Sequence, residues 1–157
     1  MAKDKKDPFK TLARNRKAAH EYILEDHFEA GIVLRGTEIK SARSGEVSLK
    51  EAYVQISDEE AWLVNAYIAP YKAASAFNHD PRRRRKLLLH RREILSLDAK
   101  VRQRGYTVVP TRMYLKDGRA KVEIALARGK RKYDKRREIE EKDVARDIER
   151  SYARSRR

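Results

Sequence analysis

The sequence contains no cysteine and no long run of apolar residues. Without cysteine, the chain has no disulfide framework, no thiolate zinc site and no cysteine nucleophile. Residues 1–6 are mostly charged and no apolar run follows them, so we predict neither a secretory signal nor a membrane span. These absences fit a reducing compartment, and we expect a cytoplasmic protein.

Negative charge is scarce relative to positive charge. Lysine and arginine number 39 against 24 aspartate and glutamate residues, which gives a formal net charge of +15. Such a chain attracts polyanions by releasing their condensed counterions, and its candidate partners are nucleic acid and an anionic membrane surface. Binding to a membrane surface needs a basic helix with a broad apolar face, and the sequence contains none. We therefore predict a nucleic-acid partner and no membrane.

The length of 157 residues is typical of one domain, and charge divides it into three parts. Residues 1–14 are basic and have little to bury, which predicts a mobile arm. Residues 15–129 carry the apolar patterning and form the predicted folded domain. Residues 130–157 are basic again, with an apolar stripe too narrow to hold a lone helix. We expect this tail to be disordered when free and helical on a partner.

Alternating and β-branched stretches predict two hairpins in the folded domain. Residues 52–56 and 62–68 flank a polar turn, and residues 107–115 and 120–126 flank a second turn. Pro110 lies inside one of these strands and predicts an edge or a bulge there.

Two short helices accompany the predicted hairpins. Residues 36–43 have helical character and stop at Gly45, and an apolar stripe within residues 91–104 ends at Gly105. Short strands closed by turns, with small helices beside them, predict a mainly β fold. The expected architecture is a compact antiparallel β-barrel, whose closure removes exposed sheet edges.

A cluster of positive charge in the middle of the chain has no acidic residue within it. Its members are Arg82, Arg83, Arg84, Arg85, Lys86, Arg91 and Arg92. The planar fork of arginine suits phosphate oxygens, so we interpret the cluster as a phosphate-binding surface. The alternative is a solvated surface of mutually repelling charges.

Aromatic residues near positive charge are candidates to stack on unpaired bases. Tyr133 is the strongest candidate, because it lies in the basic segment 130–137 without apolar neighbours that could form a core. For Tyr53 a structural role in a strand is the stronger alternative. The remaining candidates are Tyr22, Tyr71, Phe77 and Tyr152.

Signals for an enzyme are weak. The four histidines are scattered without the spacing of metal ligands, and no phosphate-cradling glycine loop is present. Asp26 with Glu38 and Lys40 could bind magnesium in a nuclease, but Glu38 falls in a predicted helix rather than a strand. We therefore predict no catalytic residues, no metal and no cofactor.

Short motifs follow one another in order from about Asn15 to Arg150. They are Asn15–Ala18, His20–Tyr22, Phe28–Leu34, Gly36–Ser41, Asp80–Pro81, Arg83, Arg85–Leu89, Glu93–Ile94, Gly105–Pro110, Lys121–Ile124, Gly129–Lys130 and Asp134–Arg136. No single motif is diagnostic, but the ordered set resembles the small protein B family, the SsrA-binding proteins of bacterial trans-translation.

The resemblance implies an oligonucleotide-binding-type (OB-fold) barrel with flanking helices, which holds the tRNA-like domain of tmRNA (SsrA). In the family, the positions matching Tyr22, Glu29, Leu88 and His90 contact RNA, although the position of His90 is often asparagine. Together with residues of the basic cluster, the predicted RNA-binding set is Tyr22, Glu29, Arg83, Arg85, Lys86, Leu88 and His90.

The family's tail enters the empty messenger channel of a stalled ribosome and becomes helical there. The resemblance implies that the decoding site and small-subunit ribosomal RNA are bound by Lys130, Tyr133, Asp134, Lys135 and Arg136. The expected function is a monomeric adaptor that delivers tmRNA to stalled ribosomes, while the ribosome supplies the peptidyl-transfer chemistry. The alternatives are a general structural protein of the ribosome and the magnesium nuclease.

Overall fold

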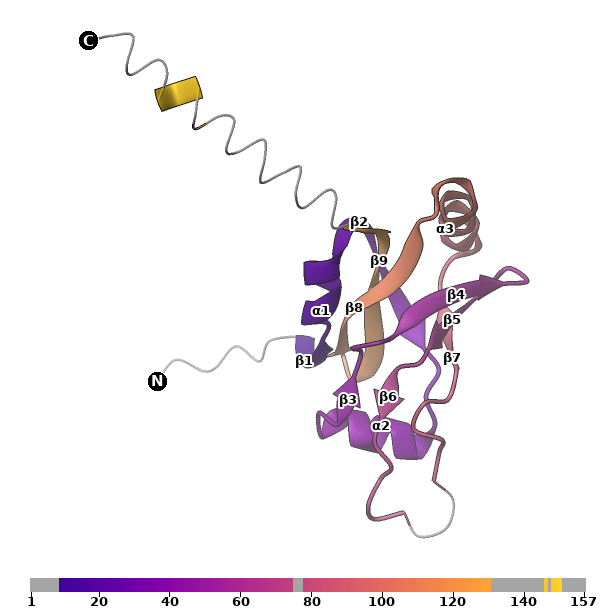
Figure 1. Ribbon diagram of the computed structural model, residues 1–157. Coiled ribbons are helices and arrows are strands. Elements are labelled where there is room, and N and C mark those ends of the chain that lie inside the picture. Colours follow the sequence, from indigo (N-terminus) through magenta and orange to yellow (C-terminus); the bar gives the residue numbers. More distant parts are fainter. Residues whose placement is uncertain (1–8, 75–77, 131–145, 147, 151–157) are drawn as a thin grey trace.

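A computed structural model of the chain describes residues 9–74, 78–130, 146 and 148–150. Within these residues the chain forms antiparallel strands and three helices of six or more residues, and residues 146 and 148–150 are also helical (Figure 1). In chain order the elements are β1 (Phe9–Arg14), α1 (Arg16–Glu21), β2 (Tyr22–Ile32), α2 (Gly36–Arg43), β3 (Val47–Ser48), β4 (Tyr53–Ser57), β5 (Glu60–Val64), β6 (Tyr67–Ile68), β7 (Arg85–Leu88), α3 (Arg91–Arg104), β8 (Thr107–Lys116) and β9 (Arg119–Gly129).

One seven-stranded sheet closes in a ring. Its strand order is β1-β8-β4-β5-β7-β2-β9, and β9 pairs back along the length of β8. The narrowest seam joins β4 to β8, where only Val54 and Val108 are in register. Strand β1 pairs with β8. The prediction of a mainly β, antiparallel fold with small helices is confirmed.

Both predicted hairpins form, because their patterns are local. Strands β4 and β5 flank the turn at Asp58 and Glu59, and β8 and β9 flank the turn at Asp117 and Gly118. The pairing of β8 with β9 shifts register just after Pro110, so the predicted bulge is confirmed.

The return strand of the first hairpin ends earlier than its sequence predicts. Asn65 has a positive φ of 65°, which breaks the extended backbone after Val64. Residues Tyr67–Ile68 then form β6, which pairs with β3 in a separate two-stranded sheet. The prediction of one continuous strand over 62–68 is therefore wrong.

The predicted mobile arm is wrong for the part of it that the structure describes. Residues Phe9–Arg14 form β1 on the edge of β8, and Leu12 is buried in the core. The ring of Phe9 meets the ring of Tyr114 edge-on, with centroids 5.7 Å apart. The register of β1 against β8 shifts between Thr11 and Ala13, and at this irregularity Leu12 is buried while Lys10 and Arg14 stay exposed.

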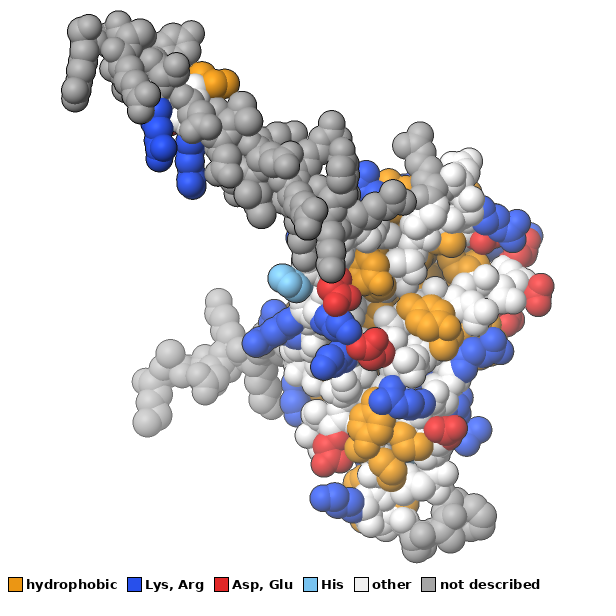
Figure 2. Space-filling view, viewed as in Figure 1, with side chains coloured by type: hydrophobic (Ala, Val, Ile, Leu, Met, Phe, Trp, Pro, Cys, Tyr) orange, Lys and Arg blue, Asp and Glu red, His pale blue; other side chains and the backbone are white. Residues whose placement is uncertain are grey.

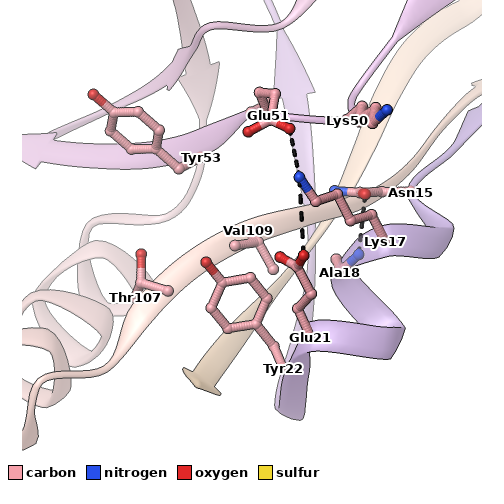
Figure 3. A pocket seen from close by; sticks show the side chains of 11 residues that line it. Asn15, Lys17, Ala18, Glu21, Tyr22, Lys50, Glu51, Tyr53, Thr107 and Val109 are labelled. Carbon is pink, nitrogen blue, oxygen red and sulfur yellow. Dashed lines mark hydrogen bonds and ion pairs between the residues drawn. The ribbon is translucent and has the colours of Figure 1, made fainter. Parts of the chain in front are cut away.

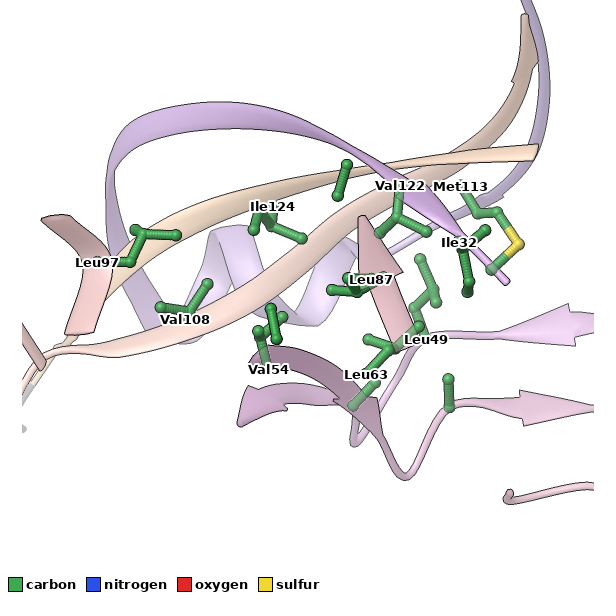
Figure 4. Packing of buried hydrophobic residues seen from close by; sticks show 14 of the residues in the cluster. Ile32, Leu49, Val54, Leu63, Leu87, Leu97, Val108, Met113, Val122 and Ile124 are labelled. Carbon is green, nitrogen blue, oxygen red and sulfur yellow. The ribbon is translucent and has the colours of Figure 1, made fainter. Parts of the chain in front are cut away.

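The core lies inside the ring (Figure 4). Every strand of the ring contributes, and α3 adds Ile94 and Leu97. Burial of each such aliphatic side chain stabilises the fold by about 1.5–3 kcal/mol. Leu95 in the same helix is 44% exposed, so the predicted apolar stripe faces the core only in part. Gly105 ends α3 with a φ of 65°, the left-handed conformation that glycine adopts without steric cost.

The described residues contain no helix that is both long and apolar enough to span a membrane.

Candidate nucleic-acid interface

Glu29 and Leu88, two of the predicted RNA-binding residues, lie together on the outside of the ring. Ala30 and Ile32 of β2 are buried, so their neighbours Glu29 and Gly31 face outwards. Gly31 pairs with Leu88 of β7, and Leu88 is 53% exposed. This places a carboxylate and an exposed aliphatic side chain about two residues apart on one outer surface.

Gly31 allows the close approach of β2 to β7 at this surface. A Cβ atom on Gly31 would lie 3.1 Å from the Cβ of Leu88 and 3.4 Å from its Cδ1. Any side chain there would push Leu88 aside. The absence of a side chain at Gly31 therefore exposes Leu88 and sets its position.

The carboxylate of Glu29 is already engaged by two donors. The Tyr114 hydroxyl donates to its Oε2, and the Lys116 ammonium group donates to its Oε1 over 3.2 Å. These bonds lower the pKa of Glu29, the Tyr114 bond most of all. Burial raises the pKa of Tyr114, and its bond to Glu29 raises it further. Glu29 thus joins the buried Tyr114 to Lys116 at the surface.

A second carboxylate on β9 continues the same network. Glu123 pairs with Glu29 across the strands, and its Oε2 accepts from the Nε of Arg112 over 2.9 Å. The guanidinium of Arg112 also lies 4.5 Å from the centroid of the Tyr114 ring. Sequence reasoning missed Arg112, Tyr114 and Lys116, although their i, i+2, i+4 spacing on one strand is a readable signal of a shared face.

The arginine cluster is divided between the inside and the outside of the fold. Arg83 and Arg85 both turn inwards to the carboxylate of Glu38 on α2, Arg83 at 2.5 Å from Oε1. Arg85 is fully buried, and its remaining N–H groups donate to the carbonyl oxygens of Ala66 and Pro81. The prediction that Arg85 is a surface contact for RNA is wrong, because its donors are consumed by the protein.

The other members of the cluster remain at the surface. Arg82 and Arg84 are exposed, and Lys86 is half-exposed with its ammonium group 3.3 Å from a carboxylate oxygen of Glu60. His90 is exposed at the start of α3, where its backbone N–H donates to Glu93 over 3.2 Å. Lys86, Leu88 and His90 therefore follow one another along one surface.

The magnesium-nuclease alternative fails on the surroundings of Glu38. Burial raises the pKa of Glu38, but hydrogen bonds from Arg83, the Arg35 backbone and Arg85 outweigh it and leave the pKa below its usual value. Both of its oxygens are occupied. Asp26 is held 2.6 Å from the Lys100 ammonium group. Across the described ranges, no group of three or more acidic, histidine or cysteine side chains could hold a metal ion.

Tyr22 lies at a different location from Glu29. It opens β2 opposite Gly129, whereas Glu29 lies opposite Glu123. Seven residues of strand separate the two by about 23 Å at 3.3 Å per residue. The structure therefore brings Glu29, Lys86, Leu88 and His90 to one region and leaves Tyr22 in another.

Tyr22 lines a pocket between α1, β4 and β8 (Figure 3). The pocket is about 290 Å³ and also holds Tyr53, which is 44% exposed. At its rim the Lys17 ammonium group lies 2.5 Å from Glu51 and 3.9 Å from Glu21. Within the described chain neither tyrosine hydroxyl forms a hydrogen bond. Tyr22 is half-buried against the small cluster of Ala18, Val109 and Ala127, and with the exposed ring of Tyr53 it offers aromatic surface on which a nucleobase could stack.

The asparagine before α1 fixes this pocket to the ring. The side chain of Asn15 accepts from the backbone N–H of Ala18 over 3.2 Å and donates to the carbonyl of Pro110 over 2.9 Å. Its backbone N–H donates to Thr111 over 2.8 Å. Both carbonyls, those of Pro110 and Thr111, lie at the bulge of β8. This bulge therefore holds α1, which forms one wall of the pocket, against the ring.

The predicted tail residues Tyr133, Asp134, Lys135 and Arg136 lie outside the described residues, as do Phe77 and Tyr152. The backbone N–H of Lys130 donates to the carbonyl of Glu21 over 2.9 Å. This bond places the start of the tail at the end of α1, beside the Tyr22 pocket.

Positive charge is not confined to the arginine cluster. On the face in Figure 2, lysine and arginine side chains are scattered among apolar and acidic side chains. The Tyr71 ring has the Lys40 ammonium group 5.4 Å from its centroid. A long polyanion could contact such a surface at several separate places.

Comparison with known proteins gives a consistent match. The family profile described as SmpB protein matches residues 12–154. An SsrA-binding protein of Sulfurihydrogenibium sp. (strain YO3AOP1) is 57% identical over 143 residues, covering 91% of this chain and 94% of the relative. One from Thermobifida fusca is 54% identical, covering 98% of this chain and 96% of the relative. One from Staphylococcus aureus (strain Newman) is 56% identical, covering 96% of each.

A solved structure agrees in fold as well. It is described as "tmRNA-SmpB: a journey to the center of the bacterial ribosome" and matches with a TM-score of 0.65. It is 48% identical in sequence, over 84% of this chain and 93% of the solved chain.

Proposed function

This chain belongs to the SmpB family, and we propose that it is a non-enzymatic adaptor that binds tmRNA and acts with it on stalled ribosomes in trans-translation. The observation that carries the proposal is the match of residues 12–154 to the family, together with relatives named for SsrA binding. The net charge of +15 supplies the attraction that an RNA ligand requires.

The ring of strands is an OB-type barrel in this proposal, and its outer surface over β2, β7, β8 and β9 holds the tRNA-like domain of tmRNA. Leu88 supplies an exposed apolar contact for a sugar or base. Lys116, held by Glu29, and Lys86 supply donors to phosphate and ribose oxygens. His90 can donate to RNA or stack on a base.

The Tyr22 pocket takes an unpaired base of the same RNA, because aromatic stacking is how proteins select single-stranded nucleotides. Residues 130–157 form the ribosome-binding tail and become ordered in the empty messenger channel. Lys130, Lys135 and Arg136 meet ribosomal phosphates, and Tyr133 stacks on small-subunit ribosomal RNA with Asp134 beside it. The site of action is the cytoplasm, and the protein acts as a monomer.

The experiment tests the role of the folded domain, residues 15–129, separately from that of the tail, residues 130–157. A chain that ends at Gly129 should bind a transcript of the tRNA-like domain with an affinity within about threefold of the full chain. The same truncation should abolish peptide tagging in a reconstituted stalled-translation reaction. A truncated chain that no longer binds the transcript would refute this division of labour, and so would one that still supports tagging.

The surviving alternative is a general structural protein of the ribosome. A constitutive ribosomal protein is present at one copy in every ribosome, whereas an adaptor is substoichiometric and enriched on stalled ribosomes. Quantitative mass spectrometry of ribosomes, with and without induced stalling, decides between them. Equal stoichiometry in both samples would favour the structural role.

A further inference from the structure

Arg84 lies over the ring of the only tryptophan of the chain. Its guanidinium carbon lies 4.1 Å from the centroid of the Trp62 ring on β5. Lys86 lies directly opposite Trp62 in the register of β5 with β7, and Arg84 precedes it by two residues. Arg84 and Lys86 therefore flank one indole ring on the outside of the sheet.

A second arginine near it is held in the same way. The guanidinium carbon of Arg82 lies 5.5 Å from the centroid of the Tyr67 ring, and its Nη1 donates to Oδ1 of Asn65 over 3.1 Å. Arg82 and Arg84 alternate with Arg83 and Arg85, which turn inwards. The ion pairs of Arg83 and Arg85 with Glu38 fix the backbone of this segment, and this backbone directs the side chains of Arg82 and Arg84 outwards.

Among the described residues, the guanidinium groups of the two outward arginines are not bound to a carboxylate. In the part of the chain that the structure describes, Arg82 and Arg84 form no ion pair with a carboxylate, whereas Arg91, Arg102 and Arg112 each do. No described carboxylate therefore pairs with either guanidinium, although the Asp80 carboxylate accepts from the backbone N–H of Arg82 over 2.9 Å. Contact with an aromatic ring covers one face of the guanidinium and leaves the N–H groups at its edge available, except for Nη1 of Arg82, which donates to Asn65.

A guanidinium fixed in this way is suited to phosphate. Its fork matches two oxygens of a phosphodiester, and the stacked ring limits the freedom that the side chain would lose on binding. Trp62 and Tyr67 serve as supports for the arginines here rather than as stacking platforms for bases.

We propose that Arg84, supported by Trp62, binds a backbone phosphate of RNA, and that Arg82, supported by Tyr67, binds another phosphate beside it. The proposal rests on the RNA-binding function proposed above. It adds to the contact at Leu88 a second contact site, formed by the arginines that precede β7 and by the aromatic rings beneath them. The ligand chemistry is a phosphodiester, which either tmRNA or ribosomal RNA can supply.

The single tryptophan gives a direct readout. Addition of a transcript of the tRNA-like domain, or separately of purified small ribosomal subunits, should change the emission of Trp62 by at least about 20% at saturation. Arg84→Ala should weaken binding of the responding partner about tenfold and lower the slope of log K against log salt by about 0.7–0.9, the value for one lost phosphate contact.

Two further variants separate charge from geometry. Trp62→Leu leaves the charge of Arg84 in place, so the salt slope should stay unchanged while the affinity falls a few-fold, measured by anisotropy of labelled RNA. Arg84→Lys should keep the salt slope and weaken RNA binding about threefold, because lysine lacks the planar, forked guanidinium group of arginine. The control is Arg43→Ala, which removes another exposed arginine without an ion pair on α2. It should change neither quantity, and circular dichroism confirms that each variant is folded.

The possible outcomes identify the source of the phosphate and distinguish failure of this site from failure of the proposed function. An effect of Arg84→Ala on the tRNA-like domain alone assigns the phosphate to tmRNA, and an effect on the subunit alone assigns it to ribosomal RNA. If RNA binds while Trp62 emission and the Arg84→Ala salt slope both stay unchanged, this site is refuted but the proposed function stands. If the unaltered chain prefers the tRNA-like domain no more than an unrelated hairpin, the proposed function itself fails.

Discussion

Substitution of Glu38 should destabilise the fold strongly, because Glu38 is the shared partner of Arg83 and Arg85. Glu38→Ala leaves Arg85, which is fully buried, and Arg83, whose side chain is 25% exposed, without their shared carboxylate. Removing one partner of a buried ion pair costs about 3–5 kcal/mol, because a desolvated charge is left uncompensated. That is a large share of the 5–15 kcal/mol that separates a typical folded domain from its unfolded chain.

The assay is urea unfolding followed by the emission of Trp62. With a slope of about 2 kcal/mol per molar, a loss of 3–5 kcal/mol lowers the midpoint by about 2 M. Glu38→Gln keeps the shape and one acceptor and should lose less. The double variant Glu38→Leu with Arg85→Met replaces the pair by apolar groups of similar size and should recover most of the stability.

The control for this series is Asp26→Asn, which breaks the exposed pair with Lys100 and should leave the midpoint unchanged. A midpoint for Glu38→Ala within about 0.5 M of the unaltered protein would refute the reasoning. So would a double variant as unstable as the single one. The first result would mean that the fold does not depend on the pairing of Arg85 with Glu38, and the second that apolar side chains cannot replace this pair.

Three further perturbations test the site. Hydrogen bonds hold the pKa of Glu29 and of Glu38 below the usual value of 4.5. The two carboxylates therefore stabilise the fold above pH 4.5, and this stability is lost as the pH falls through their lowered pKa values in the folded protein. The melting temperature measured against pH tests this. Gly31→Val crowds Leu88 and should cost about 1–3 kcal/mol and weaken RNA binding, by urea titration and anisotropy. Tyr114→Phe removes a donor to Glu29 and should cost about 1 kcal/mol in the same titration.

Each of these has a matched control or contrary result. Gly129→Ala meets no atom within 4 Å and should behave like the unaltered chain, which isolates the crowding at Gly31. A melting temperature that stays flat from about pH 6 to pH 3 would contradict the carboxylate prediction. Unchanged stability of Tyr114→Phe would show that the hydroxyl bond is not retained in solution.

Local patterns in the sequence were sufficient for much of the fold. The two hairpins, the helix that ends at Gly105 and the bulge at Pro110 depend on neighbours within a few residues, which the sequence displays directly. The edge strand β1 could not be predicted in the same way. Its partner β8 lies about one hundred residues further on, and its basic side chains resemble those of a mobile arm.

The candidate site was predictable only in part for the same reason. Four consecutive arginines look equivalent in sequence, yet Glu38, from 45 and 47 residues away, draws in Arg83 and Arg85 and leaves Arg82 and Arg84 outside. Composition reveals the charge of such a segment but not which side chains point into the protein and which point to solvent. The position of a buried partner, here Glu38, decides this, and only the folded structure shows that position.

The most direct test of the account is to identify the RNA that the protein holds in its own cells. Affinity purification of the tagged chain under ultraviolet crosslinking, followed by sequencing of the bound RNA, should recover tmRNA as the most enriched species, with crosslinks in its tRNA-like domain. Enrichment of ribosomal RNA alone, with tmRNA at its background level, would contradict the account.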